Sequence, residues 1–181
     1  MRKLIVAAFV SLDGVVESPG DWALQYYTQD EMRQSFLARV TDCDALLFGR
    51  VTYEMFAQIA ASAKGDPYFD RLGSLPKHVA SKTLREATWN ATVIQGDVAK
   101  EVAKLKAQPG KNIMKYGCGS LDKTLVEHDL IDEFHFTIFP VIAGKGQRLF
   151  EGIDMSRQKF SLTETKRYSN GAITLSYIKA K

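Results

Sequence analysis

Arg50 and Thr52 have the chemistry to bind a phosphate, and they follow directly after an apolar run and a glycine in the stretch LLFGRVTYE. Residues 46–48 are typical of a buried strand and Gly49 of a tight turn, and the apolar spacing that follows predicts a helix. We expect Thr52 to cap this helix, whose free N–H groups would attract an anion beside the Arg50 guanidinium. Alternatively, Gly49 only closes a turn and Arg50 is a solvated surface charge.

A second strand, glycine turn and helix occur further along the chain. Residues 112–116 are strand-like, and Gly117, Gly119, Ser120 and Leu121 follow, with Ser120 at the expected helix cap. This corner also suits a phosphate, because unpaired backbone N–H groups converge at a helix N-terminus. One G-x-G pattern is weak evidence, since glycines also mark tight turns for packing, but two such corners strengthen one another.

Hydroxyl and ammonium groups end a third short strand, which we predict over residues 77–83. Ser81 and Lys82 would receive a phosphate there through charge-assisted hydrogen bonds. Alternatively, Ser81 and Thr83 cap a helical turn that runs toward Glu86, which is the commoner use of such residues.

The end of the first apolar run offers contacts for a substrate. Residues 4–10 predict a strand buried on both faces, and Asp13 and Gly14 follow it. Ligands of open α/β sheets lie beyond the carboxyl ends of the strands, although a plain Asp-Gly turn is the alternative. Trp22 falls in a stretch expected to be irregular, so either the core or a ligand must cover its ring.

A predicted helix carries two candidate proton donors, Asp30 and Glu31. Thr28 and Glu31 fit a capping box, and the apolar stripe of residues 32–40 supports the helix. Either acid would serve as a proton donor if it protruded into a pocket. Carboxylates in a first turn usually complement the helix dipole, which is the alternative interpretation.

Elements that alternate between strand and helix must position these groups. Residues 92–94 are strand-like, residues 97–109 predict a helix, and residues 62–74 are expected to cross the surface as a polar segment. Near the C-terminus, Ser169-Asn170-Gly171 signals a hairpin between two strands. The sequence therefore predicts an α/β fold, with helices on both faces of a mostly parallel sheet and an antiparallel C-terminal hairpin.

The composition excludes several classes of protein. The 181 residues suffice for one domain, placed at residues 1–181, and the net charge of +3 includes no basic run, so we expect no nucleic-acid partner. No stretch reaches the roughly 18 apolar residues of a membrane helix, so we expect a cytoplasmic protein without a membrane partner. The histidines and cysteines share no metal-ligand spacing, and we predict no metal.

Taken in order, these motifs resemble the dihydrofolate reductase-like superfamily, and within it the RibD C-terminal domain family, the reductase domain of riboflavin biosynthesis. The resemblance runs almost from end to end of the chain, over residues 11–14, 49–54, 77–83, 117–121 and 140–150. Each motif alone is weak, but their order is specific. The sequence starts at the first reductase strand, and we expect no deaminase domain of the kind that often precedes that reductase.

The resemblance implies a three-layer dihydrofolate reductase-like fold and an oxidoreductase that binds NADPH. Its hydride would go to a small heterocyclic or ribosyl substrate, as in 5-amino-6-(5-phosphoribosylamino)uracil reductase. Residues 49–52 would hold one cofactor phosphate, Ser81 and Lys82 would lie near the adenosine 2′-phosphate, and the pyrophosphate would lie on residues 117–121. The substrate side would be lined by Asp13, Gly14 and Trp22.

The resemblance also implies a homodimer, with Phe134, Phe136 and Phe139 as one candidate interface, although phenylalanines at this spacing are more often core. Two other functions stay open. A true dihydrofolate reductase would need Asp30 or Glu31 to face the pterin. A nucleotide-binding module would keep the fold without the chemistry.

Overall fold

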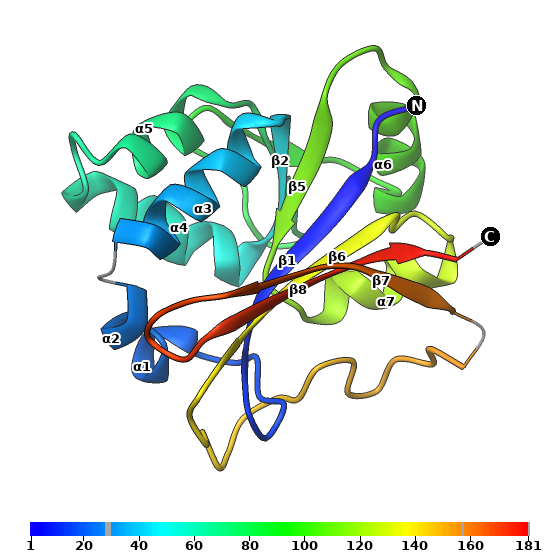
Figure 1. The fold of residues 1–181 in the computed structure, drawn as a ribbon. Coiled ribbons are helices and arrows are strands. Elements are labelled where there is room, and N and C mark those ends of the chain that lie inside the picture. Colours follow the sequence, from blue (N-terminus) through cyan, green and yellow to red (C-terminus); the bar gives the residue numbers. More distant parts are fainter. Residues whose placement is uncertain (28–29, 157, 181) are drawn as a thin grey trace.

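The computed structural model describes residues 1–27, 30–156 and 158–180, and its centre is one eight-stranded sheet (Figure 1). Parallel strands come first along the chain: β1 (Leu4–Ser11), β2 (Cys43–Gly49), β3 (Lys77–Ala80), β4 (Ala91–Ile94), β5 (Asn112–Tyr116) and β6 (Glu133–Phe139). The last two, β7 (Phe160–Arg167) and β8 (Ile173–Lys179), run antiparallel to their neighbours. The order across the sheet is β4-β3-β2-β5-β1-β6-β8-β7.

Helices cover both faces of the sheet (Figure 1). One face packs against α3 (Asp30–Thr41), α4 (Arg50–Ser62) and α5 (Pro67–Ser74), and the opposite face packs against α6 (Val98–Ala107) and α7 (Ser120–Glu127). Two one-turn helices, α1 (Pro19–Trp22) and α2 (Leu24–Tyr27), precede α3. The predicted α/β fold with helices on both faces is confirmed.

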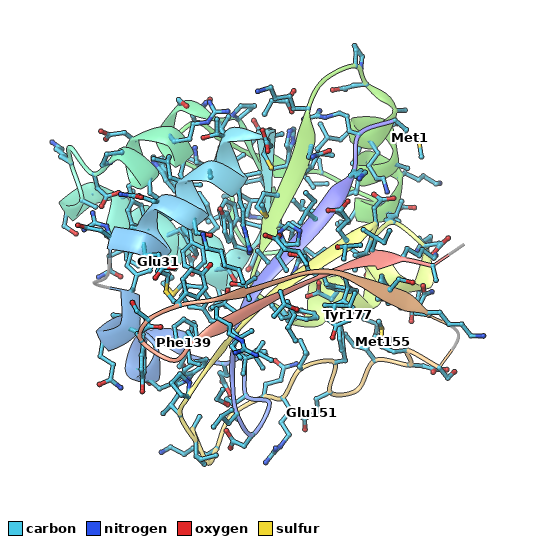
Figure 2. The ribbon with its side chains drawn as sticks, in the orientation of Figure 1. Met1, Glu31, Phe139, Glu151, Met155 and Tyr177 are labelled. Carbon is cyan, nitrogen blue, oxygen red and sulfur yellow. The ribbon has the colours of Figure 1, made fainter. Side chains whose placement is uncertain are left out.

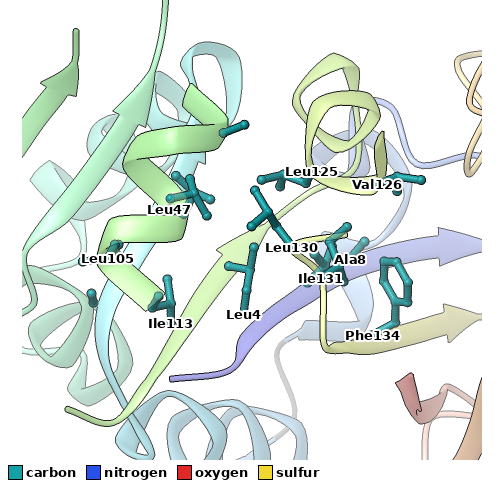
Figure 3. Packing of buried hydrophobic residues seen from close by; sticks show 14 of the residues in the cluster. Leu4, Ala8, Leu47, Leu105, Ile113, Leu125, Val126, Leu130, Ile131 and Phe134 are labelled. Carbon is teal, nitrogen blue, oxygen red and sulfur yellow. The ribbon is translucent and has the colours of Figure 1, made fainter. Parts of the chain in front are cut away.

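Two hydrophobic cores follow from the alternation of side chains along the strands. In β1, Leu4 and Val6 belong to the core under α6 and α7, whereas Ile5 belongs to the core under α3, α4 and α5. Figure 3 shows the first core, where Leu105 of α6 and Leu125 of α7 reach the sheet. Full burial of one such leucine stabilises the fold by about 1.5–3 kcal/mol. The apolar run of β1 is thus buried on both faces, as predicted.

The C-terminal hairpin is confirmed. β7 and β8 pair antiparallel with Arg167 opposite Ile173, and the Tyr168 N–H donates to the Ala172 carbonyl at 2.9 Å across the turn. Gly171 takes a φ of +87°, which costs a glycine little. Asn170 fixes the turn further, because its side-chain oxygen accepts from the Ala172 N–H at 3.0 Å.

The expectation of a polar surface segment over residues 62–74 is wrong, because α5 forms there. Asp66 caps this helix by accepting from the N–H groups of Tyr68 and Phe69 at 2.9 and 3.2 Å, and Pro67 occupies its first turn. Tyr68 and Leu72 of α5 are buried in the core between this helix and the sheet. The capping box predicted at Thr28 falls outside the described residues.

The phenylalanines considered for a dimer interface lie in the interior. Phe134, Phe136 and Phe139 are at most 9% exposed, and the first two stack in the core under α6 and α7 with ring centroids 5.0 Å apart. They therefore stabilise the single chain. In the part of the chain that the structure describes, no helix has the length and apolar character needed to cross a membrane.

Candidate functional site

A cleft of about 1560 Å³ opens at the carboxyl ends of β1, β2, β3 and β5. Its volume exceeds the roughly 300–1,000 Å³ typical of a site for one drug-sized ligand, so it has room for more than one. The structure brings together in its lining all the residues that the sequence predicted for cofactor binding: Gly49, Arg50, Thr52, Ser81, Lys82, Gly117, Gly119, Ser120 and Leu121.

The first corner of the cleft is the start of α4. The predicted cap at Thr52 is wrong, because the helix begins at Arg50, and Gly49, which has no side chain to accept from the helix N–H groups, takes the cap position three residues earlier. Among the described residues, no cap side chain therefore accepts from the first N–H groups of α4, which can bind a ligand. Arg50 lies beside them, where it donates to Glu54 at 2.7 Å and to the Thr83 hydroxyl at 2.5 Å.

The second corner touches the first. Gly117 has a φ of +75°, and a Cβ atom placed on it would lie 3.0 Å from the Thr52 hydroxyl oxygen. A side chain at position 117 would thus meet both backbone strain and a steric contact. Gly119 takes the cap position of α7, one residue before the predicted Ser120. Both helices consequently present N-termini capped by glycine toward one cleft.

A buried ion pair supports the glycine turn. Lys115 Nζ lies 2.7 Å from Asp122 Oδ2, and the two side chains are 3% and 0% exposed. Lys115 also donates to the Gly117 carbonyl at 2.6 Å, and Asp122 accepts from the Gly119 N–H at 2.7 Å. Burial raises the pKa of neighbouring Cys118 to about 12, so this thiol stays protonated. The Lys115–Asp122 pair therefore holds the backbone of the glycine turn at Gly117 and Gly119.

The segment after β3 places Ser81 and Lys82 in the cleft lining and forms a local turn. The Ser81 hydroxyl accepts from the N–H groups of Thr83 and Leu84 at 3.2 and 2.9 Å, so it closes a local turn. Neither residue caps a helix, because β3 ends at Ala80 and no helix of the described chain follows before α6. Lys82 is exposed at the edge of the cleft.

Asp13 and Gly14 do not reach the cleft lining in the part of the chain that the structure describes. Asp13 instead joins two loops: it accepts from the Ser11 hydroxyl at 2.6 Å and from the amides of Ala143 and Gly144 at 3.0 and 2.9 Å. These hydrogen bonds, the one from Ser11 first, lower the pKa of Asp13 to about 2. Gly14 accepts from the Leu149 N–H at 2.8 Å between the same loops.

The two loops form one rim of the cleft. Val16 donates to the Gln147 carbonyl at 2.9 Å, and Glu17 accepts from the Gln147 N–H at 2.7 Å. Val16, Glu17 and Gln147 all line the cleft. Asp13 and Gly14 therefore do not line the cleft themselves. They hold together the two loops that border it.

Trp22 is the last residue of α1, where the sequence suggested irregular chain. Its indole N–H donates to the Glu17 carbonyl at 3.0 Å, and its ring lies 6.1 Å from the ring of Phe139. The core therefore covers this ring, and Trp22 is absent from the described cleft lining.

The two candidate proton donors also lie away from the cleft lining that the structure describes. Asp30 borders a separate hollow next to Arg33 and Asp66. Glu31, labelled in Figure 2, faces the hairpin turn, where it accepts from the N–H and hydroxyl of Ser169 at 3.3 Å each. Both acids sit in the first turn of α3, where negative charge complements the helix dipole.

Sequence reasoning missed the inner end of the cleft, which aromatic rings and Arg39 line between the sheet and α2, α3, α4 and α5. It also missed His135 and Thr137 of β6, on the strand face opposite Phe134 and Phe136. The alternation of β6 was the available signal, because it separates these two polar residues from the apolar face. No such sequence pattern marks the aromatic end, because its residues come from short segments far apart in the chain.

With this geometry in hand, comparison with known proteins assigns the family. The family model described as the RibD C-terminal domain matches residues 2–174. The chain belongs to the RibD C-terminal domain family. Among curated relatives, the Bacillus subtilis (strain 168) protein YyaP, described as uncharacterized, is 30% identical, and the alignment covers 97% of this chain and 94% of YyaP.

Solved structures of a putative riboflavin biosynthesis protein and of a dihydrofolate reductase share the fold. The putative riboflavin biosynthesis protein of Shewanella sp. PV-4 superimposes with a TM-score of 0.74 at 25% identity, over 99% of both chains. A dihydrofolate reductase of Enterococcus faecalis, complexed with NADP(H), gives a TM-score of 0.64 at 18% identity, over 99% of this chain and 97% of that one. The predicted dihydrofolate reductase-like fold is thus confirmed.

Proposed function

We propose that this RibD C-terminal domain protein is an NADPH-dependent reductase that transfers hydride to a small heterocyclic or ribosyl substrate, as 5-amino-6-(5-phosphoribosylamino)uracil reductase does. One observation carries the proposal. Three strand ends, chosen from the sequence for phosphate-binding chemistry, meet in the lining of one cleft. Membership of a family named for a riboflavin-pathway protein supports the same conclusion.

The residues at the three strand ends, which we call the polar end of the cleft, have the charges and donor groups to bind the phosphates of a dinucleotide. Arg50 and Thr52 would bind one phosphate at the start of α4, and residues 117–121 would place backbone N–H groups on the pyrophosphate. Lys82 and Ser81 would hold the adenosine 2′-phosphate, because Lys82 is exposed at the cleft edge and free to approach it. Bound NADPH would supply the hydride from its nicotinamide ring.

The remaining residues would position the substrate and keep water out. The joined loops at Glu17 and Gln147 border the cleft and would limit solvent access. Substrate contacts belong to the aromatic end, since Asp13, Gly14 and Trp22 act behind the lining. The positions of Asp30 and Glu31 argue against the dihydrofolate reductase alternative, which needs an acid in the cleft.

The activity is tested by mixing the purified protein with NADPH and candidate substrates, starting with riboflavin precursors and dihydrofolate, and following NADPH absorbance. Substrate-dependent oxidation with a riboflavin precursor is the expected result. Oxidation with dihydrofolate alone would favour the dihydrofolate reductase alternative. Tight NADPH binding without oxidation across the whole panel would favour the nucleotide-binding module. We also propose the homodimer that the family resemblance implies, for which light scattering should give twice the 20.2 kDa of one chain.

A further inference from the structure

We infer that the inner end of the cleft binds a planar substrate through an anionic oxygen group, with the Arg39 guanidinium as its charge partner and the linked hydroxyls of Tyr68 and Tyr116 as a hydrogen-bond donor beside it. The inference deepens the proposed function and rests on it, because it names the class of molecule that would lie next to the nicotinamide.

Aromatic side chains surround this end of the cleft as a connected set: Phe9, Tyr27, Phe36, Phe56, Tyr68, Phe69 and Tyr116. Neighbouring ring centroids lie 5.0 to 6.3 Å apart along the whole set, within the range of favourable ring contacts. The set joins strands β1 and β5 to helices α2, α3, α4 and α5. Walls of this kind favour a flat ring in the part of the ligand that they contact.

Arg39 is a half-buried cation of the described lining that has no protein partner there. Arg50 is engaged by Glu54 and Lys115 by Asp122, whereas Arg39 makes no side-chain hydrogen bond or ion pair with any residue that the structure describes. It is half-buried, and its charge acts on the Tyr116 phenol, whose pKa it lowers against the larger effect of burial. Lys82, at the other end of the cleft, is exposed to solvent.

Negative charge to neutralise Arg39 is scarce around the described cleft. Glu17 is the acidic residue of its lining, and the Gln147 N–H already occupies one of its carboxylate oxygens. A guanidinium without a protein partner in a partly buried site favours a ligand that brings the anion itself. Carboxylate and phosphate oxygens both meet this need.

The tyrosine hydroxyls add donors beside that charge. Tyr68 and Tyr116 share a hydrogen bond, and the Tyr27 hydroxyl is buried without a partner among the described residues. Burial raises the pKa of all three phenols, so they stay protonated at neutral pH and donate hydrogen bonds. Because a phenol has one O–H group, the Tyr68–Tyr116 pair uses one O–H internally and keeps the other for a ligand oxygen in the cleft.

Calorimetric titration with matched probes tests the inference. Naphthalene-2-carboxylate, 2-naphthyl phosphate and the neutral naphthalene-2-carboxamide share one planar body and differ in charge. We expect the parent protein to bind at least one anion about tenfold or more tighter than the amide, as a charge-assisted hydrogen bond requires. Which anion binds tighter distinguishes a carboxylate from a phosphate substrate. Equal affinity for all three probes, or binding of none, would overturn the inference.

Variants locate the effect. Arg39→Met should abolish the preference for the anions, Arg39→Lys should retain part of it, and Tyr116→Phe should weaken anion binding by a smaller factor. Arg85→Gln, which removes an exposed arginine outside the described cleft lining, is the matched control and should behave as the parent does. An undiminished preference in Arg39→Met, with a normal thermal melt, would contradict the assignment.

A separate NADPH titration keeps this inference distinct from the proposed function. Arg39→Met should bind NADPH as the parent does, because Arg39 lies at the aromatic end. If the parent binds no NADPH yet shows an Arg39-dependent anion preference, the cofactor proposal fails and the anion site stands. If NADPH binds and the anion preference is missing, the reductase proposal stands and this inference fails.

Discussion

At the scale of single residues, one buried ion pair also holds the backbone beside the cleft. Lys115 and Asp122 illustrate this role, since each also holds a backbone group of the glycine turn at residues 117–119. A buried pair adds little net stability compared with apolar residues of similar size, but removing one partner leaves an uncompensated charge. Their pairing consequently matters for the shape of the turn as well as for folding.

Lys115→Met should lower the free energy of unfolding by about 3–5 kcal/mol, because the Asp122 carboxylate would stay buried without its partner. Chemical denaturation measures this directly. The double variant Lys115→Met with Asp122→Asn is the control and should recover part of the loss, since the unpaired charge is gone. A single variant as stable as the parent would contradict the role given to the pair.

Lys77 provides a pH-dependent test. Its side chain is buried, donates to the carbonyls of Gly73 and Leu75 at 3.2 and 2.7 Å, and lies 4.2 Å from the Trp89 ring centroid. Burial lowers the pKa of Lys77 to about 8. The unfolded chain therefore binds more protons than the folded protein between about pH 8 and pH 10.5, and stability rises with pH through that window.

We expect the unfolding free energy of the parent, relative to Lys77→Met, to increase by about 2–3 kcal/mol from about pH 7 to pH 10.5. Groups that titrate in both proteins cancel in this difference. Lys64→Met, at an exposed position, is the control and should show a flat difference over the same range. A flat difference for Lys77→Met as well would mean that burial does not shift the pKa of this lysine.

At the scale of elements, Asp13 is the link between the loop after β1 and the loop after β6. Its pKa of about 2 means that this link is intact above about pH 4 and is lost progressively as the pH falls toward 2.

Asp13→Asn should speed amide hydrogen exchange at Ala143 and Gly144, whose N–H groups donate to the carboxylate. Asp21→Asn, on an exposed residue of α1, is the matched control. Unchanged exchange in Asp13→Asn would show that the loops are joined by other contacts alone.

The elements that the sequence could predict are those with a local pattern of residues. Strand, glycine turn and helix at residues 46–60 and 112–125 are local patterns, so the polar end of the cleft was predictable from neighbours in the chain. Helix α5 was missed because Gly65, Asp66 and Pro67 read as a turn, although Asp66 followed by Pro67 is also a helix-start signal. Thr52 was misplaced at the cap because glycine, without a side chain, holds that position at the start of α4.

The aromatic end was beyond local prediction. Its rings come from β1, α2, α3, α4, α5 and β5, and nothing in the spacing of one segment indicates the others. Missing α5 also removed Tyr68 and Phe69 from the candidate list. Asp13, Gly14 and Trp22 were chosen for their place after β1, but they stabilise the rim instead of lining the cleft.

At the scale of the whole molecule, one sheet supports both ends of the cleft. The strand order places β2 and β3 on one side of β5 and β1 on the other, so the polar corners and the aromatic rings face a common opening. A two-ligand reaction needs this proximity, because hydride transfer requires donor and acceptor atoms in contact. We propose that the polar end of this opening selects NADPH over NADH.

The most direct test is a binding titration of NADPH and NADH against the parent and the variants Lys82→Ala and Lys123→Ala. We predict that the parent prefers NADPH. Lys82→Ala should weaken NADPH by about 1–3 kcal/mol and leave NADH unchanged, because only NADPH carries the 2′-phosphate. Lys123→Ala, at an exposed position of α7 outside the described cleft lining, should match the parent. Binding of neither dinucleotide by the parent, or an equal effect of Lys82→Ala on both, would contradict the account.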